Sequence, residues 1–454
     1  MNNKELESKI SSAISPLALK ILETFSKNNT ESYLVGGFVR DCLLSRKTSD
    51  IDIAAKSTPQ QTKALFEKKF TVIDTGIKYG TVTVIDPDES AQQCEVTAFR
   101  SESGYFDSRH PSDVSFSANL KDDLSRRDFT VNALAYNKNS GLVDLFGGLK
   151  DLSAKIIRCV GDPDTRFAED ALRMLRAVRF SSKLIFDIEP ETLNSIRKNA
   201  ALIKNVSAER ITKELNLMLL EEKPSAAFFL MQKTGLLKHI LPEIDIMTGF
   251  DQKNPAHPYD LLTHTLKTID NSEPLLPVRL ACLLHDTGKI HTFTIDENGA
   301  GHFYGHEKIS AKITENVLKR LKYPAKTVKL VTELVSRHQI NPYAITDKGI
   351  RRIIAAISEK PALMLANLQY ADSSATLLKD NMLFTNKLKA LLAKEQRLTV
   401  KKLAVNGYDM MDLDFEGKEI GSVLNKLLEY VLENPENNSR EKLIEKAKSY
   451  RHNN

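Results

Sequence analysis

Two patterns of apolar residues divide the chain. In about the first 145 residues, short runs rich in β-branched residues, bounded by glycine and polar residues, predict strands. From about residue 152 onward, apolar residues recur at helical spacing and the strand pattern nearly disappears. We therefore predict a multidomain protein with an α/β head followed by an all-α remainder. The predicted strands are residues 33–35, 51–53, 81–85, 95–99 and 132–136.

Polar segments and prolines indicate where the domains meet. The polar stretch between residues 99 and 129 is predicted to be a long functional or mobile loop. Residues 245–258 are predicted to be a linker, and residues 434–440 a break before a last short helix. The predicted domains are residues 1–148 for the head, 149–245 for a helical neck, 246–380 for a histidine-rich helical domain and 381–454 for a helical tail.

Composition narrows the class of protein only slightly. The chain has 454 residues, and its formal net charge of +5 permits a nucleic-acid partner without requiring one. The four cysteines are scattered, which argues against a zinc site and against a disulfide framework. We expect a cytoplasmic protein with no membrane partner, because residues 1–15 do not resemble a signal peptide and no run of about 18 apolar residues occurs.

An Asp-x-Asp sequence provides the first candidate chemistry. Asp50 and Asp52 lie on a predicted apolar strand, where residues i and i+2 point to the same face. Two carboxylates this close need a cation between them, and the hard ion Mg²⁺, which takes oxygen ligands, fits. Glu95, on a later strand, is a candidate third carboxylate. Taken alone, these acids also fit a solvated strand edge, so the metal site depends on the surrounding motifs.

A glycine pair and several arginines are candidates for binding phosphate. Gly36 and Gly37 let the backbone approach a phosphate closely, and Arg40 follows them. Arg126 and Arg127 add guanidinium groups, whose fork matches phosphate oxygens. An ordinary turn is the alternative for the glycines, and a surface ion-pair network is the alternative for the arginine pair.

Four charged residues recur every three positions just beyond the head. On one helix, Asp170, Arg173, Arg176 and Arg179 would form a polar stripe, and its three arginines would repel one another unless an anionic group lay opposite. Asp170 and Arg173, one turn apart, are predicted to form a rigid donor–acceptor pair that can read the Watson–Crick edge of a base. A solvated basic face is the alternative.

Histidines and aspartates mark a second candidate site in the histidine-rich domain. A separated histidine, the dipeptide His285-Asp286 and a distal aspartate are predicted on successive helices. Imidazole and carboxylate ligands together suit Mn²⁺, Ni²⁺, Co²⁺ or Fe²⁺, and less often Mg²⁺. A buried core pair is the alternative for His285-Asp286 taken alone. The candidate ligands are His264, His285, Asp286, Asp372, His306 and His338.

The motifs together resemble those of class II tRNA nucleotidyltransferases, the family of CCA-adding enzymes and bacterial poly(A) polymerases. Residues 36–52 are similar to the first family motif, 127–133 to the second and 169–176 to the nucleotide-reading motif. Residues 208–214 resemble a motif that steadies the nucleotide-reading helix, and residues 405–421 resemble the C-terminal segment. The resemblance covers nearly the whole chain, and the combination is much more specific than any single motif.

This resemblance implies a polymerase-β-like mixed sheet in the head and template-free addition of C, C and A to the 3′ end of tRNA from CTP and ATP. It implies that Asp50 and Asp52 hold two Mg²⁺ ions that activate the RNA 3′-hydroxyl, with Glu95 as a further carboxylate. Asp107 and Arg109 would belong to a flexible loop linked to the final A addition. The implied nucleotide-binding residues are Gly36, Gly37, Arg40, Arg127, Asp128, Asn132, Asp170, Arg173, Arg176 and Arg179.

The histidine-rich domain resembles the HD phosphohydrolase superfamily. The resemblance implies metal ligation by His264, His285, Asp286 and Asp372, with His306 and His338 as ligands of a second metal or as phosphate contacts. Some members that carry such a domain are implied to hydrolyse 2′,3′-cyclic phosphates or simple phosphate esters. An inherited, inactive scaffold is the alternative.

Three rival functions share parts of this pattern. A poly(A) polymerase has the same head motifs, and an enzyme restricted to A addition or to CC addition differs only in the number and kind of nucleotides added. A metal-dependent phosphohydrolase with an RNA-binding head is the rival from another class. The intact Asp50/Asp52 pair argues against that rival and against a non-catalytic RNA-binding protein.

Overall fold

The computed structural model describes most of the chain. The described residues are 3–48, 51–76, 80–88, 92–105, 111–116, 119–377, 382–394 and 398–451. Asp50, Asp107 and Arg109, three of the predicted site residues, lie outside them. The chain forms two compact units, the first comprising residues 1–218 and 226–240 and the second residues 219–225 and 241–454. Each unit is therefore described by itself.

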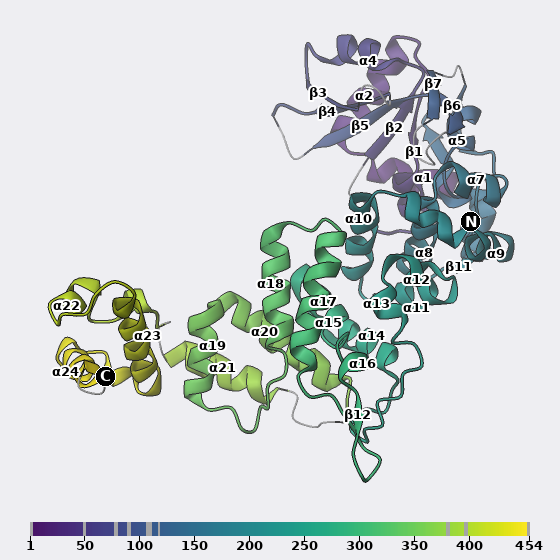
Figure 1. Ribbon diagram of the computed structural model, residues 1–454. Coiled ribbons are helices and arrows are strands. Elements are labelled where there is room, and N and C mark those ends of the chain that lie inside the picture. The colour runs from purple at the N-terminus through teal and green to yellow at the C-terminus, as the bar shows by residue number, and fades with distance from the viewer. Residues whose placement is uncertain are drawn as a thin grey trace. The chain divides into compact units, whose positions relative to one another are not determined.

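A seven-stranded mixed sheet forms the head (Figure 1). The central strands β2 and β5 run parallel, whereas every other neighbouring pair in this sheet is antiparallel. The predicted α/β head is confirmed. In spatial order the strands are β3 (Thr71–Gly76), β4 (Thr81–Ile85), β5 (Gln93–Ala98), β2 (Ile51–Ala55), β1 (Ser32–Val35), β8 (Leu134–Asn137) and β9 (Gly141–Asp144).

Capped amphipathic helices cover this sheet. The helix α2 (Pro16–Lys27) begins with a proline after Ser15, whose side chain accepts a hydrogen bond from the backbone of Ala18. The apolar face of α2 meets α4 (Pro59–Phe66) through an edge-to-face contact of Phe25 with Phe66. Both aromatic rings are fully buried, so the helices bury apolar surface that a solvated sheet face would expose.

Most of the predicted strands are present, but one predicted loop is wrong. The strands β1, β2 and β4 contain the predicted segments, and β8 begins at Leu134 because residues 130–132 form a short 3₁₀ turn. The stretch predicted as a loop contains a hairpin of β6 (Arg100–Tyr105) and β7 (Pro111–Phe116), followed by α5 (Leu120–Ser125). This hairpin is formed by backbone hydrogen bonds between two polar segments. Such segments lack the apolar alternation from which strands are predicted, so the sequence did not reveal it.

Helices dominate the rest of the first unit, as predicted. A two-residue pairing of β10 (Ile156–Ile157) with β11 (Asp187–Ile188) interrupts them. The helices of this unit are α1 (Asn3–Ala13), α3 (Gly37–Leu43), α6 (Gly148–Ala154), α7 (Pro163–Glu169), α8 (Leu172–Leu184), α9 (Pro190–Asn199), α10 (Ala208–Leu219), α11 (Ser225–Lys233) and α12 (Leu236–Ile240), with 3₁₀ segments η2 (Thr130–Asn132) and η3 (Ala200–Asn205).

The second unit begins with a short helix and an irregular connection. Within residues 246–260, all of which the structure describes, no helix or strand is assigned. The helices α14, α15, α17, α18 and α20 then pack against one another. A hairpin of β12 (Thr294–Ile295) and β13 (Gly301–His302) lies between α16 and α17 along the chain. The helices are α13 (Pro242–Asp245), α14 (Leu261–Asn271), α15 (Leu276–Leu284), α16 (Lys289–Thr292), α17 (His306–Arg320), α18 (Ala325–Ser336), α19 (Asp347–Ile357), α20 (Glu359–Ser374) and α21 (Leu383–Lys394).

The tail has an apolar core of its own, in which Leu427, Val431 and Leu443 are fully buried. The polar break predicted at residues 434–440 contains a 3₁₀ turn before the last helix. None of the helices that the structure describes is both long enough and apolar enough to cross a membrane. The tail elements are η4 (Val400–Lys402), α22 (Gly407–Met411), α23 (Lys418–Glu433), η5 (Pro435–Asn437) and α24 (Arg440–Arg451).

Candidate functional site

The first candidate site begins at Asp52, in the middle of the head sheet. The neighbours of Asp52 on β2, Ile51 and Ile53, are buried, so Asp52 points to the opposite face. In the parallel pairing of β2 with β5, Asp52 lies directly opposite Glu95. Paired residues on adjacent strands present their side chains to the same face, so the sheet brings these two carboxylates side by side. Asp50, the other half of the predicted pair, lies outside the described residues.

Gly36 lets an arginine approach Asp52. The φ angle of Gly36 is +71°, a conformation that glycine adopts readily. A Cβ atom on Gly36 would lie 2.8 Å from Nη1 of Arg127 and 3.8 Å from Oδ2 of Asp52. Any side chain at this position would therefore push the Arg127 guanidinium away from the end of β1. Gly36 therefore leaves room for the Arg127 side chain, and the predicted close approach of the glycine turn to a phosphate stays a prediction.

A buried chain of hydrogen bonds connects α3, which begins at Gly37, to α8. Arg40 Nη1 donates to Oδ1 of Asn132 at 2.5 Å, and Asn132 Nδ2 donates to Oδ1 of Asp128 at 2.9 Å. Arg176 Nε then donates to Oδ2 of Asp128 at 2.8 Å. Burial would raise the pKa of Asp128, but the charge of Arg176 and hydrogen bonds from Asn132 and Arg176 lower that pKa to about 2. Asp128 is therefore an ionised acceptor that holds Arg176 directly and Arg40 through Asn132.

Protein carboxylates also balance the arginine stripe on α8. Glu214, on α10, accepts a hydrogen bond from Arg179 Nε at 2.5 Å and lies 3.6 Å from Nη1 of Arg176. The ring of Phe180 packs against three guanidinium groups, at 5.0 Å from Arg40, 5.2 Å from Arg176 and 4.2 Å from Arg179. Repulsion within the stripe is thus offset by Asp128, Glu214 and one aromatic ring.

The predicted continuous helix through Asp170 is wrong. The helix α7 ends at Glu169, Asp170 is extended with φ −147° and ψ 99°, and α8 begins at Leu172. Asp170 therefore precedes the helix that carries the three arginines. The repeat of charged residues every three positions crosses this break without a proline or glycine to mark it, which is why the sequence pattern concealed it.

Other side chains hold Asp170 and Arg173 in place. Arg210 donates to both carboxylate oxygens of Asp170, at 3.1 and 2.7 Å. Arg173 donates to Glu169 Oε2 at 2.7 Å and to the backbone oxygen of Arg126 at 2.9 Å. Each member of the predicted pair thus has its own support, instead of one supporting the other. A fork-to-fork arginine–carboxylate contact leaves little freedom for Asp170.

These side chains line one cavity of about 570 Å³. Seven arginines and three aspartates contribute to its wall, so the cavity is strongly cationic and suits an anionic ligand. The lining residues are Gly36, Gly37, Arg40, Asp52, Arg100, Arg126, Arg127, Asp128, Asn132, Asp170, Arg173, Arg176, Arg179 and Phe180.

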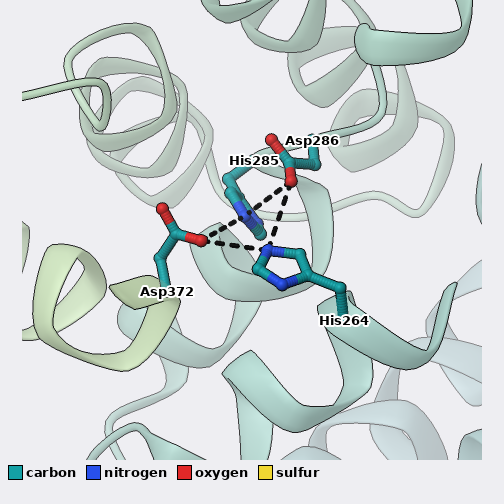
Figure 2. A group of neighbouring side chains, drawn as sticks. All are labelled: His264, His285, Asp286 and Asp372. Carbon is teal, nitrogen blue, oxygen red and sulfur yellow. Dashed lines mark ion pairs between the residues drawn. The ribbon is translucent and has the colours of Figure 1, made fainter. Parts of the chain in front are cut away.

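A second candidate site lies in the second unit, where four predicted ligands converge (Figure 2). His264 Nε2 lies 3.0 Å from Oδ1 of Asp372 and 3.4 Å from Oδ2 of Asp286. His285 Nε2 lies 3.2 Å from the same oxygen of Asp286. His264 is on α14, His285 follows the last residue of α15, and Asp372 is on α20, so four helices separate the last two along the chain. The prediction that these residues lie on successive helices is wrong, because four other helices lie between α15 and α20. The packing of α14, α15 and α20 nevertheless brings the residues together.

Asp286 also joins a second group. Its other oxygen, Oδ1, lies 3.3 Å from Nε2 of His306 and 3.7 Å from Nε2 of His338. The Nε2 atoms of His306 and His338 are 3.1 Å apart. Lys289 Nζ lies 2.8 Å from Oδ2 of Asp286. One carboxylate thus faces all four histidines, two through each oxygen.

The donor set fits divalent metal ions. The Nδ1 atoms of His285, His306 and His338 each lie within 2.8 Å of a backbone carbonyl oxygen. That oxygen accepts a hydrogen bond from Nδ1–H, which leaves the lone pair of Nε2 directed toward the cluster. The ligand atoms of His264, His285, Asp286 and Asp372 all lie within 4.8 Å of one another, and the side chains of His264, His285 and Asp286 are buried. Burial would lower the pKa of His285, but Asp286 and Asp372 raise it to about 10, so the cluster favours a positive charge.

Three family models match successive parts of the chain. The model of the poly A polymerase head domain matches residues 32–158. A model described as a probable RNA- and SrmB-binding site of polymerase A matches residues 185–247, and an HD domain model matches residues 261–364. The order of these matches follows the order of the head, the helical neck and the histidine-rich domain.

A curated relative covers nearly all of this chain. A CCA-adding enzyme from Lactobacillus helveticus (strain DPC 4571) is 36% identical over 426 residues, which are 93% of this chain and 94% of the relative. The chain belongs to the CCA-adding enzyme family. A CCA-adding enzyme from Levilactobacillus brevis (strain ATCC 367) is 33% identical over 90% of this chain and 92% of its own length.

Solved structures of CCA-adding enzymes have the same fold. The Bacillus stearothermophilus CCA-adding enzyme in complex with CTP is 28% identical, with a TM-score of 0.74 over 97% of this chain and 100% of that chain. The Thermotoga maritima CCA-adding enzyme complexed with tRNA is 19% identical, with a TM-score of 0.60 over 98% of both chains, a likeness of fold alone.

In this CCA-adding enzyme family member, the head cavity brings together all the predicted nucleotide-binding residues and Asp52. Glu95 is placed next to Asp52 by the sheet, with its side chain exposed. Sequence reasoning missed Arg100 and Phe180 in the cavity wall. It also missed Asp123, which accepts hydrogen bonds from Arg126 at 2.6 Å and from Arg127 at 3.0 Å. The spacing of Asp123, three and four residues before those arginines, was a readable signal for a helical ion pair.

Proposed function

We propose that this chain adds C, C and A to the 3′ end of tRNA from CTP and ATP without a nucleic-acid template. The observation that carries the proposal is the position of Asp52 in the wall of a cavity lined by seven arginines. A nucleoside triphosphate carries several negative charges, which such a wall neutralises through hydrogen bonds from guanidinium groups. Membership of the CCA-adding enzyme family and the likeness to a relative solved in complex with CTP support the same substrate class.

We propose that Asp52, together with Asp50, holds the Mg²⁺ ions of the head, with Glu95 as a neighbouring carboxylate. Bound there, Mg²⁺ would favour the ionised form of the RNA 3′-hydroxyl and neutralise charge on the departing pyrophosphate. Arg127 and Arg40 orient the triphosphate, and Gly36 leaves room for the guanidinium of Arg127. Ion pairs hold the arginines in place before a nucleotide arrives, so less side-chain entropy is lost on binding.

Asp170 and Arg173 are the proposed base-reading residues. A carboxylate accepts hydrogen bonds and a guanidinium donates them, so the two together match an edge that carries both an amino group and a ring acceptor. Both C and A present such an edge, whereas U and G present their donors and acceptors in a different order. Arg210 and Glu169 fix the two reading groups, and this rigidity supports discrimination by protein side chains alone.

A transfer assay on tRNA ending at the discriminator base tests this proposal. With CTP alone we expect two nucleotides to be added, and with CTP and ATP together we expect three additions and then a stop. Continued extension with ATP would instead identify a poly(A) polymerase, and addition of A to a tRNA that already ends in CC, with no use of CTP, would identify an A-adding enzyme. No extension under any condition would refute nucleotide transfer.

We propose a second, metal-dependent phosphohydrolase activity at the histidine cluster. The observation that favours it is Asp286, whose two oxygens face two pairs of histidines beside a cavity of about 320 Å³. Mn²⁺, Ni²⁺, Co²⁺ or Fe²⁺ suits imidazole and carboxylate donors and, when bound, would supply a nucleophilic water at neutral pH. In the reaction, the oxygen of water bonds to phosphorus, the ester P–O bond breaks, and the alcohol leaves with a proton.

Metal analysis tests the ligand assignment. After incubation with Mn²⁺ and exhaustive dialysis, His285→Ala is expected to bind Mn²⁺ roughly 100-fold more weakly than the unchanged chain, because it loses a buried nitrogen donor. His291→Ala is the matched control, since His291 is exposed on α16, outside the cluster. Equal metal content in all three proteins would refute a site at these residues.

We also propose that the chain acts in the cytoplasm, where tRNA and nucleoside triphosphates are available to it.

A further inference from the structure

An exposed aromatic residue lies at the edge of the second cavity. Tyr304 is 79% exposed, and its ring stacks on that of His302, with centroids 5.4 Å apart and planes inclined by 6°. A single exposed aromatic residue on a protein surface needs no explanation. Tyr304 differs because it lines the same cavity as Asp286, His306 and His338. Its position relative to the histidine cluster is therefore what matters.

Short covalent and hydrogen-bond links tie Tyr304 to the cluster. Tyr304 precedes His306 by two residues, and the backbone oxygen of Phe303 accepts a hydrogen bond from Nδ1 of His306 at 2.8 Å. The stacking pair is held from its other side as well, because Asp296 Oδ2 lies 2.8 Å from Nε2 of His302. The rings of Tyr304 and His302 are thus held close along the chain to His306, a proposed metal ligand.

Gly301 fixes the hairpin that carries the ring pair. Its backbone N–H donates to the oxygen of Lys253 at 2.8 Å, and a Cβ atom on it would lie 2.2 Å from the oxygen of Gln252. Gln252 in turn accepts a hydrogen bond from Lys289 Nζ at 2.9 Å, and that amine also contacts Asp286. The hydrogen bond to Lys253 and this close backbone packing hold β13 against residues 252–253.

The cavity offers groups for each part of a nucleotide. Lys289 supplies a cation next to the cluster where a phosphate would lie. Gln369, one helical turn before Asp372 on α20, is 6% exposed, lines the cavity and has a buried amide oxygen without a hydrogen-bond partner among the described residues. That oxygen can accept a hydrogen bond from a ribose hydroxyl or a base amino group.

We propose that Tyr304, stacked on His302, is a base-stacking platform for a nucleotide whose phosphate lies at the Asp286 cluster. This inference rests on the proposed phosphohydrolase function and narrows its substrate class to phosphate esters that carry a nucleobase. A sugar phosphate would fill the cation and amide positions but would leave the aromatic ring without a partner, whereas every nucleobase has a face that stacks on an aromatic ring. The nucleotide can be free or can be the 3′ end of an RNA.

The absence of tryptophan from the chain allows a direct binding test. Tyr304→Trp introduces a single tryptophan at the proposed platform, which can be excited at wavelengths that the tyrosines do not absorb, and AMP is expected to quench its emission by stacking. Ribose 5-phosphate is expected to leave the emission unchanged. Tyr408→Trp is the matched control, because Tyr408 is also 79% exposed but lies in the tail. A nucleotide bound in the head cavity is silent in this assay, since the head has no tryptophan.

Two results would overturn the platform: no quenching of Tyr304→Trp by AMP, or equal quenching of Tyr408→Trp. A short RNA with a 3′-terminal phosphate is titrated in parallel. Tighter binding of that RNA than of AMP would identify an RNA end as the source of the nucleotide, and tighter binding of AMP would identify a free nucleotide. Either order supports stacking at Tyr304.

Hydrolysis assays separate this inference from the function on which it rests. Tyr304→Ala is expected to raise KM for AMP by about 5- to 150-fold, the range that loss of one base-stacking contact gives, and to leave KM for ribose 5-phosphate nearly unchanged. Equal effects on both substrates would refute the platform while hydrolysis itself stands. Quenching without hydrolysis of either substrate would refute the phosphohydrolase and leave a nucleotide-binding site.

Discussion

Replacing Asp52 with alanine should abolish nucleotide addition to tRNA. The substitution removes the carboxylate that lies opposite Glu95 in the sheet and beside the arginine-rich cavity. Loss of one oxygen ligand of the proposed Mg²⁺ site would remove several kcal/mol of transition-state stabilisation, so we expect the rate of C addition to fall by about 10³-fold or more. The measurement is incorporation of radiolabelled CTP into tRNA ending at the discriminator base.

Two further measurements decide what an inactive Asp52→Ala protein means. Asp74→Asn is the control, because Asp74 is exposed on β3 of the same sheet and lies outside the cavity wall. This control should retain full activity, and both variants should bind tRNA as tightly as the unchanged chain. Undiminished transfer by Asp52→Ala would contradict the assignment, and loss of transfer in the control as well would point to a damaged sheet.

Replacing Glu214 with alanine should strongly destabilise the first unit. Glu214 is 4% exposed and pairs with Arg179, which is also buried, and with Arg176. Removing one partner leaves buried guanidinium charge without its counter-charge, which costs about 3–5 kcal/mol. Transfer should fall as well, since Arg176 and Arg179 line the arginine-rich cavity in which we propose that the nucleotide binds. Urea unfolding followed by far-UV circular dichroism measures the stability change.

Glu209→Ala is the matched control for this second experiment. Glu209 is on the same helix as Glu214 but is exposed, and substitutions at such positions change stability by about 0.5 kcal/mol or less. The two compact units can unfold in separate steps, so the comparison uses the transition that Glu214→Ala shifts and asks whether Glu209→Ala leaves it in place. Coincident curves for the two variants would show that the Glu214 ion pairs are not energetically important.

Local patterns in the sequence predicted the elements that carry the head site. The strand with Asp52 was predictable because Ile51 and Ile53 alternate with it and are buried on the other face. The hairpin of β6 and β7 was not predictable, because its two paired segments are polar and show no apolar alternation. The break at Asp170 was also hidden, since a charge repeat every three residues looks helical on either side of it.

Long-range contacts explain most of what the sequence could not show about the two sites. The ion pairs of Glu214 with Arg176 and Arg179 join α10 to α8, and only the packing of those helices brings them together. Likewise, the candidate metal ligands were identifiable by residue type. The family resemblance already set His306 and His338 apart from the other ligands. That Asp286 belongs to both groups could not be read from the sequence, because it depends on the packing of helices that are far apart along the chain.

Because both groups of histidines share Asp286, both depend on this single residue. Asp286→Asn would remove the negative charge that both groups face, so this one substitution would disturb both groups at once. The arginine-rich cavity lies in the first compact unit and Asp286 in the second. A single substitution in the second unit could therefore remove the proposed phosphohydrolase site and leave every residue of the arginine-rich cavity unchanged.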